Sequence, residues 1–400
     1  MIKESAGMAT EPPDGALRAP RGALSRMGWI SWSHLLNDGC AFYLPAVLPR
    51  ILVALHKPVE MAGVIVGALY VWQTLQPLAG VWADNVGGPW FITLGLLGTL
   101  CGAGLVGLAT NMGMLVFFLM VAGIGSAVFH PSALKAARTT LHDRPGLGLS
   151  IFLVGGEIGR GSWPLFAGIL VAWFGLKALC FVALPGLLTL YFVYHALPDM
   201  PPRPAHAEKI RWRRHVGPVA LLMAFSATRA VVMYGVTTFV PILWHSRGGK
   251  LVGGASLLTT MLIVGIIGNL SGGALVDRFG RRPVLIVSSF LLIFLTPSFL
   301  FVHGEMMWVA AGLFGIALFS TFSATLLIGQ DIFPENRALG SGIALGLSNA
   351  TGALLLMPLG FIAHHGHYNR LFWIFSGMAV LMFCFAFTLG PRLTAPHPAR

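Results

Sequence analysis

Charged residues are scarce in this sequence: only 10% of its 400 residues are Asp, Glu, Lys or Arg, while 56% are hydrophobic. A soluble protein of this length needs more charged surface to stay dispersed in water. The shortage excludes the usual two or three soluble domains and indicates that lipid surrounds most of the chain.

The motifs of common enzymes are absent as well. The sequence has no G-x-x-x-x-G-K-[ST] run and no H-E-x-x-H or G-x-S-x-G element. Its four cysteines lie inside apolar runs without CxxC spacing, which favours neither a disulfide nor a metal site. We therefore expect a protein that is not an enzyme and holds no metal or organic cofactor.

Long apolar runs dominate what is present. The hydrocarbon core of a bilayer is about 30 Å thick and needs about 20 apolar residues per helix. Twelve runs of this kind lie at 27–55, 60–83, 90–109, 112–137, 146–173, 176–197, 215–245, 252–276, 283–302, 306–330, 339–364 and 368–390. The predicted fold class is an all-α polytopic membrane protein with twelve transmembrane helices.

The formal net charge of +12 comes from short basic clusters between the apolar runs. Such clusters are typical of cytoplasmic loops that face anionic lipid, so the lipid bilayer is the expected partner and nucleic acid is not. With the N-terminus inside, eighteen Lys and Arg residues fall on the cytoplasmic side and six on the other. This bias predicts a multi-pass protein of the cell (inner) membrane with both termini in the cytoplasm. We expect it to be a monomer.

The runs form two groups of six that repeat each other. Gly80 and Asp84 correspond to Gly273 and Asp277, about 193 residues later. Parallel duplication of a six-helix unit is typical of transporters that have one site between two halves. The predicted parts are a tail, a first bundle, a linker, a second bundle and a second tail, at 1–26, 27–197, 198–214, 215–390 and 391–400.

The loop after the eighth run carries a spaced set of residues: Gly273, Asp277, Arg278, Gly280, Arg281 and Arg282. This G-x-x-x-D-R-x-G-R-R pattern resembles a loop of the major facilitator superfamily. Glycine allows close helix approach, aspartate can reach a helix N-terminus, and arginine pairs with acids or lipid phosphates. We expect a conformational latch here, the alternative being a plain basic loop. The first-half copy keeps Gly80 and Asp84 but lacks the arginines.

Four short segments resemble the fosmidomycin-resistance branch of that superfamily. They are His34-Leu-Leu-Asn37-Asp38, Gln76-Pro77-Leu78, Val128-Phe129-His130-Pro131 and Val154-Gly155-Gly156. Members of that branch are regarded as drug exporters that exchange substrate for protons. The resemblance implies a major-facilitator fold of two six-helix bundles, with a proton as the coupling ion. The sequence departs from the branch at 157–163, so the substrate can differ.

Ionisable side chains inside the runs are the candidate functional residues. Each costs at least about 2.5–3.5 kcal/mol at bilayer depth and therefore usually faces a cavity. Four stand out: Asp38, Glu157, Arg160 and Arg229. The repeat places Arg229 near the position of Asp38, which suggests either an ion pair across the bundles or an Arg229 that binds an anionic substrate group. Glu157 and Arg160 share a helix face, so they either neutralise each other or leave Glu157 to carry a proton.

Three polar residues accompany these charges. His34 lies one turn before Asp38, where it either packs as a polar residue or carries a proton. Asn37 is a candidate substrate-binding residue beside Asp38. His130 precedes Pro131 near the cytoplasmic end of the fourth run, where it marks either a gate or a simple helix end.

These residues favour a secondary active transporter that exports small amphipathic compounds or drugs in exchange for protons, by alternating access. Asp38 or Glu157 would bind proton and substrate in turn, because one buried charge can bias two conformations. A first alternative is a proton-coupled importer of an organic anion or other small metabolite, with Arg160 and Arg229 as the anion clamp. A second is a membrane sensor that keeps the scaffold without transport.

Overall fold

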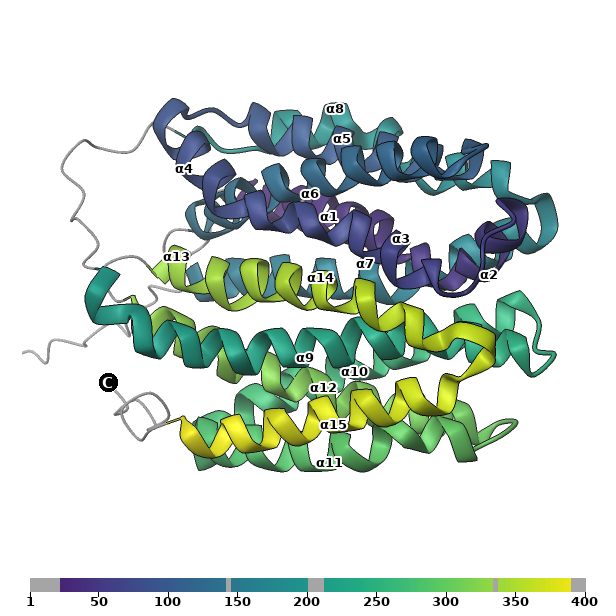
Figure 1. Cartoon of the computed structure of the whole chain (residues 1–400). Helices are drawn as coiled ribbons and strands as arrows, with labels where there is room; N and C mark the ends of the chain where they lie inside the picture. Colours follow the sequence, from purple (N-terminus) through teal and green to yellow (C-terminus); the bar gives the residue numbers. More distant parts are fainter. Residues whose placement is uncertain (1–21, 142–144, 201–211, 334–336, 390–400) are drawn as a thin grey trace, which may run out of the picture.

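The computed structural model describes residues 22–141, 145–200, 212–333 and 337–389. These residues form helices joined by short connections, and no β-strand occurs among them. Figure 1 shows the first half of the chain lying above the second half, with the helices of both halves roughly parallel to one another. The predicted all-α class is confirmed.

The helices of the first half follow the predicted runs closely. They are α1 (Ala23–Phe42), α2 (Leu44–Ala54), α3 (Met61–Tyr70), η1 (Val71–Leu75), α4 (Gln76–Val86), α5 (Trp90–Leu105), η2 (Val106–Leu108), α6 (Met112–Thr140), α7 (Pro145–Phe174), η3 (Leu176–Val182) and α8 (Leu184–Ala196).

The helices of the second half repeat this order, with one continuous helix for each span except the eleventh. They are α9 (Trp212–Ser246), α10 (Leu251–Phe279), α11 (Arg281–Phe301), α12 (Met306–Ile332), α13 (Arg337–Ser341), the π-helical η4 (Gly342–Leu347), α14 (Ser348–Gly360), η5 (Phe361–Gly366) and α15 (Tyr368–Thr388).

Some spans consist of consecutive helical pieces. The first span changes from α1 to α2 at Tyr43, and Pro45 and Pro49 follow in α2. Proline has no N–H to donate and its ring clashes with the preceding turn, so it bends or breaks a helix. Pro77 lies in the first turn of α4, directly after the 3₁₀ segment η1. The eleventh span contains the π-helical segment η4, and such segments often occur at functional sites.

Ten of the described helical segments are long and apolar enough to cross a membrane. The other two of the twelve predicted spans are α1 with α2, and α7. These two spans carry Asp38, Glu157 and Arg160. Their buried charges make them the least lipid-like spans, so they depend on contacts with other helices to stay at bilayer depth.

Two hydrogen bonds to backbone carbonyls join segments at one end of the bundle. The backbone N–H of Gly88 donates to the carbonyl of Met200 at 2.8 Å, and the side-chain Nη2 of Arg282 donates to the carbonyl of Phe387 at 2.8 Å. The predicted tails, except for residues 22–26, lie outside the described residues. The same holds for most of the predicted linker, at 201–211.

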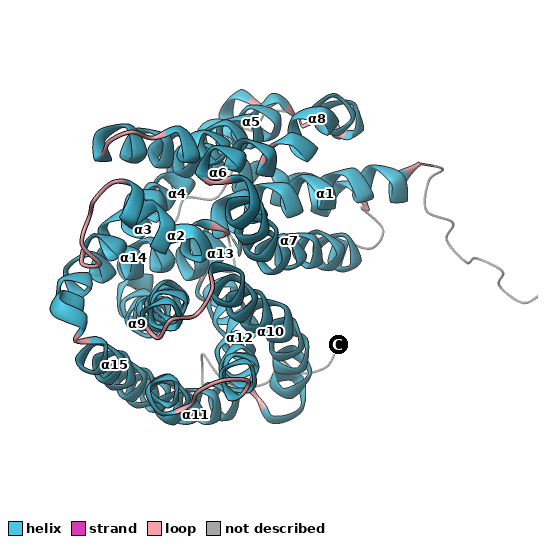
Figure 2. Ribbon diagram, turned by 90° about the vertical axis from the view of Figure 1, so that its right-hand side faces the viewer, coloured by secondary structure: helices cyan, strands magenta, loops and turns pink. Residues whose placement is uncertain are grey.

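Glycines allow the helices of the first half to approach closely. A Cβ on Gly155 of α7 would lie 3.0 Å from the carbonyl carbon of Ser31, and a Cβ on Gly159 would lie 2.9 Å from Cα of Leu35. Gly155 and Gly159 are four residues apart on α7, and the residues that they contact, Ser31 and Leu35, are four residues apart on α1. The two contacts therefore form a continuous seam between α1 and α7, which we call the glycine seam. Figure 2, viewed along the bundle, shows these two helices running side by side.

A second close contact joins α5 and α6, and it tests how much the fold depends on glycine. A Cβ on Gly95 would lie 2.6 Å from the backbone nitrogen of Phe129 and 2.8 Å from the carbonyl oxygen of Gly125.

Because backbone atoms cannot yield, we expect Gly95→Ala to destabilise the protein by about 1–3 kcal/mol. Thermal unfolding in detergent measures this. Gly377→Ala in α15 is the matched control, since nothing lies within 4 Å of that position; equal melting temperatures for the two variants would contradict the expectation.

Candidate functional site

A buried carboxylate on α1 brings together charged side chains from three helices. Asp38 is only 4% exposed. Its Oδ2 lies 3.3 Å from Nε2 of His34 and 3.3 Å from Nε of Arg160, and its Oδ1 lies 3.1 Å from Nε2 of His130. The Nε–H of Arg160 is not aligned for a hydrogen bond, so that contact is an ion pair by distance alone. We call these four residues the Asp38 cluster.

Local sequence explains why His34 reaches this place. His34 and Asp38 are one turn apart on α1, so their side chains share a face. The imidazole of His34 stacks on Phe152 with ring centroids 3.9 Å apart. A Cβ on Gly156 would lie 2.6 Å from Nε2 of His34, so glycine at that position leaves the space that the ring fills. Gly155 and Gly156 thus have separate roles, one for helix packing and one for the imidazole.

Both histidines of the cluster are held by backbone carbonyls. Nδ1 of His34 lies 2.7 Å from the carbonyl oxygen of Phe152, and Nδ1 of His130 lies 2.8 Å from that of Ser126. A carbonyl oxygen only accepts hydrogen bonds, so each Nδ1 carries a hydrogen. In a neutral imidazole the other nitrogen, Nε2, is then a bare acceptor.

This tautomer has a consequence for Asp38, because each Nε2 faces a carboxylate oxygen. Two acceptors do not form a hydrogen bond, so the 3.1 Å hydrogen bond between Nε2 of His130 and Oδ1 of Asp38 requires a proton on the imidazole or on the carboxyl group. The 3.3 Å contact of His34 is an ion pair by distance alone, and it attracts the carboxylate only when the imidazole holds a second proton. With both protons bound the Asp38 cluster carries two net positive charges, and without them it is neutral. The cluster therefore offers two buried ring nitrogens at which a proton would strengthen the contact with Asp38.

A polar chain extends from the cluster into the first half. The amide Nδ2 of Asn37 donates to Oδ1 of Asp38 and to Oγ of Ser126, both at 3.2 Å, while Oγ1 of Thr99 donates to Oδ1 of Asn37 at 2.8 Å. Ser126 also accepts from Nε2 of Gln73 at 3.2 Å. Asn37, predicted as a binding residue, thus orients the carboxylate of Asp38.

The predicted neutral pair of Glu157 and Arg160 is not found in the described part of the chain. Arg160 turns to Asp38 instead, and Glu157 accepts a hydrogen bond from Nδ2 of Asn269 on α10. Oγ of Ser323 donates to Oδ1 of Asn269 at 3.2 Å, which fixes the amide so that its NH2 group faces Glu157. Glu157 therefore lies at the boundary between the halves, next to a cavity of about 10 Å³ that is about large enough for one water molecule.

The predicted ion pair between Asp38 and Arg229 is also wrong for this conformation. Arg229 on α9 is 0% exposed, and its guanidinium lies over the ring of Phe322, with Cζ 3.8 Å from the ring centroid. Its one hydrogen bond goes from Nη2 to Oδ1 of Asn349, at 3.4 Å. Position in the repeat predicted that Arg229 faces the other half but not that Asp38 already has His34, His130 and Arg160 around it.

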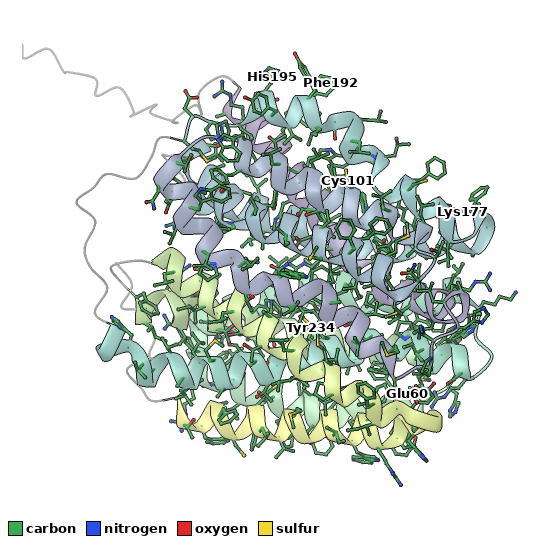
Figure 3. All side chains as sticks on the ribbon, turned by 45° about the horizontal axis from the view of Figure 1, so that its top comes forward. Glu60, Cys101, Lys177, Phe192, His195 and Tyr234 are labelled. Atoms are coloured by element: carbon green, nitrogen blue, oxygen red, sulfur yellow. The ribbon has the colours of Figure 1, made fainter. Side chains whose placement is uncertain are left out.

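Aromatic rings join the two halves beside these charges. Tyr70 of α3 stacks on Tyr234 of α9 with centroids 4.4 Å apart, and Figure 3 shows Tyr234 near the boundary between the halves. Gln76 meets η4 across the same boundary, because a Cβ on Gly346 would lie 3.1 Å from the side-chain amide carbon of Gln76. The boundary is thus lined with aromatic rings and amides.

Sequence reasoning missed several polar residues of this region. They are Thr99, Ser126, Asn269, Ser323 and Asn349. Two of them, Asn269 and Asn349, are amides inside long apolar helices, and that isolation was a usable signal because a buried amide needs hydrogen-bond partners. Thr99 and Ser126 gave no such signal, since small hydroxyl residues commonly bond to their own helix backbone.

Three members of the Asp38 cluster have the residue types of metal ligands. The ligand atoms of His34, Asp38 and His130 all lie within 4.8 Å of one another. Arg160 shares the same carboxylate, however, and its positive charge repels a further cation. We do not assign these side chains as metal ligands, and the absence of a metal site stays a prediction.

Comparison with known proteins now places the chain in a family. The sequence model described as Major Facilitator Superfamily matches residues 30–355, with a further match at 251–400. The chain belongs to the Major Facilitator Superfamily. This membership confirms the predicted superfamily and the prediction of a transporter rather than an enzyme.

Individual relatives support the same placement. The chain is 29% identical over 353 residues to the fosmidomycin resistance protein of Escherichia coli (strain K12), covering 85% of this chain and 86% of that protein. It is 25% identical to the uncharacterized MFS-type transporter YfnC of Bacillus subtilis (strain 168), covering 83% and 84% respectively. A crystal structure of a bacterial homolog to the human lysosomal transporter Spinster, in an inward-facing and occupied conformation, superposes with a TM-score of 0.75 at 16% identity. That match covers 93% of this chain and 97% of the other, and it shows the fold.

Only some residues of the predicted latch contact other helices in the structure. Arg281 is 3% exposed, and its Nη1 lies 2.6 Å from Oδ2 of Asp331 at the end of α12. Gly280 has φ of 84°, in the left-handed region that glycine adopts readily, and it joins α10 to α11. Arg282 lies against Phe387 of α15. Arg278 is exposed and lies over the ring of Phe279.

Two details of the latch prediction are wrong. Asp277 is exposed and has no hydrogen-bond or ion-pair partner among the described residues, so it does not cap a neighbouring helix there. The close approach to α12 uses Gly272, where a Cβ would lie 2.6 Å from Cα of Ser320, whereas one on Gly273 would have 3.6 Å of room to Ser323. In the first half Asp84 binds Nζ of Lys135 at 2.8 Å, a partner that the degenerate motif did not reveal.

The Asp38 cluster can be tested through energetic coupling. Residues in direct contact show interaction energies of about 0.5–3 kcal/mol in double-mutant cycles, whereas separated residues are additive. We expect Asp38→Asn and Arg160→Gln each to destabilise the protein, because each leaves a buried charge unpaired, and the double variant to lose less than the sum. Unfolding free energies in mixed detergent measure the cycle.

The same cycle with Arg229→Gln in place of Arg160→Gln is the control. Asp38 and Arg229 make no contact in this conformation, so their effects should add. Coupling of Asp38 to Arg229 but not to Arg160 would show that the sequence-based pairing, rather than the structure, describes the folded protein.

Proposed function

We propose that the protein exports small amphipathic compounds in exchange for protons, by alternating access of a site between its two halves. The observation that carries this proposal is the Asp38 cluster, in which two tautomer-locked imidazoles face one buried carboxylate. Its relative in Escherichia coli is named for resistance to fosmidomycin, which supports a drug as the substrate and export as the direction.

The cluster links proton binding to conformation through electrostatics. When both Nε2···Oδ contacts hold a proton, α1 and α6 are joined to each other through Asp38. When the protons leave, the bare acceptors repel the carboxylate, and only Arg160 and the amide of Asn37 still attract it. The change of two unit charges in a buried site favours a different arrangement of these helices, and a substrate that binds one arrangement is thereby coupled to protons.

Glu157 is the second coupling candidate because its partner lies in the other half. The hydrogen bond between Glu157 on α7 and Asn269 on α10 crosses the boundary that alternating access must rearrange. An ionised Glu157 accepts this bond more strongly than a neutral one, because charge-assisted hydrogen bonds are the stronger kind. Protonation of Glu157 would therefore loosen α7 from α10.

The setting of the protein follows from the same proposal. The bias of basic residues and the bacterial relatives support an inner-membrane location with both termini in the cytoplasm. We take the monomer as the transport unit, with lipid as its surroundings and the proton as the coupling ion.

Import of an organic anion is the second candidate function. The fully buried Arg229, without a carboxylate partner among the described residues, favours an anionic substrate in either direction of transport. The direction of proton flow relative to substrate separates the two candidates.

Transport in proteoliposomes tests the proposal. A host strain that lacks its own exporters first identifies a compound whose toxicity the protein relieves, with fosmidomycin as the first candidate. For an antiporter, an acidic lumen should drive uptake of that compound as protons leave. Asp38→Asn should reduce this uptake on the order of tenfold or more, since even 1.4 kcal/mol of lost coupling is a factor of ten. Glu157→Gln should reduce its pH dependence.

Arg50→Gln is the control, because Arg50 is exposed on α2 and makes no contact with the site. Uptake driven by an acidic exterior instead would establish the importer. Full gradient-driven uptake by both Asp38→Asn and Glu157→Gln across the pH range would refute the coupling assignment.

A further inference from the structure

Arg229 is a buried cation whose hydrogen-bond donors are mostly unused. The side chain is 0% exposed, and neither Nε nor Nη1 has a partner. Of the five N–H donors of a guanidinium, only one on Nη2 is engaged, through the 3.4 Å contact with Asn349. That contact is long and its acceptor is neutral.

The two described carboxylates buried near the middle of the bundle, Asp38 and Glu157, have other partners than Arg229. Asp38 already has His34, His130 and Arg160 around it. Glu157 accepts from Asn269. An arginine stays protonated in proteins, so it cannot escape the cost of burial by losing its charge. A buried charge without a counter-charge is strongly unfavourable, which indicates that an anion from outside the chain completes the site.

The ring of Phe322 does not replace that anion. A cation over an aromatic face is attracted by the ring quadrupole, but the N–H groups point outward in the guanidinium plane and remain unpaired. Phe322 instead fixes the plane, because it covers one face of the guanidinium. The forks at Nη1/Nη2 and Nε/Nη2 then present parallel donors of the kind that bind a carboxylate or phosphonate through two oxygens.

The residues around Arg229 also indicate what kind of molecule carries the anionic group. Phe322 stacks on Phe319 at 5.0 Å between ring centroids, and Tyr234 stacks on Tyr70 across the boundary between the halves. These rings offer a flat, largely apolar surface next to the cation, which suits an organic anion better than a small inorganic ion.

We propose that Arg229, backed by Phe322 and Asn349, is the subsite that binds the anionic group of an amphipathic organic substrate, with the aromatic rings contacting its apolar body. This inference rests on the transport function proposed above and adds the chemical class of the substrate. Because Arg229 is closed off in this conformation, the anion enters when the halves separate.

Ligand binding to the purified full-length protein tests the subsite without any pH gradient. Benzoate and phenylphosphonate serve as organic anions, benzamide as the neutral isostere, and phosphate and chloride as inorganic anions. We expect benzoate or phenylphosphonate to raise the melting temperature, and to bind about tenfold or more tightly than benzamide, because a hydrogen bond to a charged group is worth at least this factor.

The variants separate a binding role from a folding role. Arg229→Gln should bind benzoate and benzamide alike, Arg229→Lys should keep part of the preference because it keeps the charge, and Arg50→Gln should behave as the wild-type protein. If Arg229→Gln fails to fold, the preference of the wild-type and Arg229→Lys proteins for benzoate over benzamide decides the question.

Three results would overturn the subsite: equal binding of benzoate and benzamide by the wild-type protein, unchanged preference in folded Arg229→Gln, or phosphate and chloride binding as tightly as benzoate. A protein that binds benzoate through Arg229 but shows no gradient-driven flux keeps the subsite and loses the proposed antiport. A protein that carries out antiport but shows no preference for anions keeps the proposed antiport and loses the subsite.

Discussion

The carboxylate of Asp38 and the positive charges around it are the interaction on which the rest of the site depends. A charge at bilayer depth is tolerated only when it is paired or faces water. Asp38 on α1 and Arg160 on α7 belong to the two least lipid-like spans, and each provides the partner that the other needs. The glycine seam between these helices brings their backbones close enough for that contact. The charge pairing of Asp38 and Arg160 therefore depends on the close packing of α1 and α7.

The two histidines give this arrangement its chemistry. A histidine with both nitrogens in water can exchange its tautomer, but His34 and His130 each have one nitrogen tied to a carbonyl. Only Nε2 remains to respond to protons, and in both residues it faces the same carboxylate. The backbone of α7 and α6 thus decides where a proton can sit, and Gly156 leaves the room for one of the rings.

The halves repeat each other in fold and differ in chemistry. The first half contains the compact Asp38 cluster, whereas the second has an isolated cation, Arg229, with amides and aromatic rings around it. The contacts near the loops differ in the same way: Asp84 binds Lys135 in the first half, and Arg281 binds Asp331 in the second. The first half thus holds the cluster that we propose to bind protons, and the second half holds the cation that we propose to bind an anion, in a duplicated scaffold of the kind that transporters build around one central site.

The sequence by itself determined the all-α fold, its twelve spans and the superfamily, because long apolar runs and spaced loop motifs are local properties. It also identified Asp38, Glu157, Arg160 and Arg229, since a charge in an apolar run stands out. Which of them meet was decided only by the tertiary structure. Sequence reasoning left open whether Arg160 pairs with Glu157, its neighbour on α7, and whether Arg229 pairs with Asp38. In the folded protein Arg160 contacts Asp38 across the glycine seam instead. The partners Asn269 and Asn349 come from distant parts of the chain, and no local pattern encodes the side on which such residues face each other.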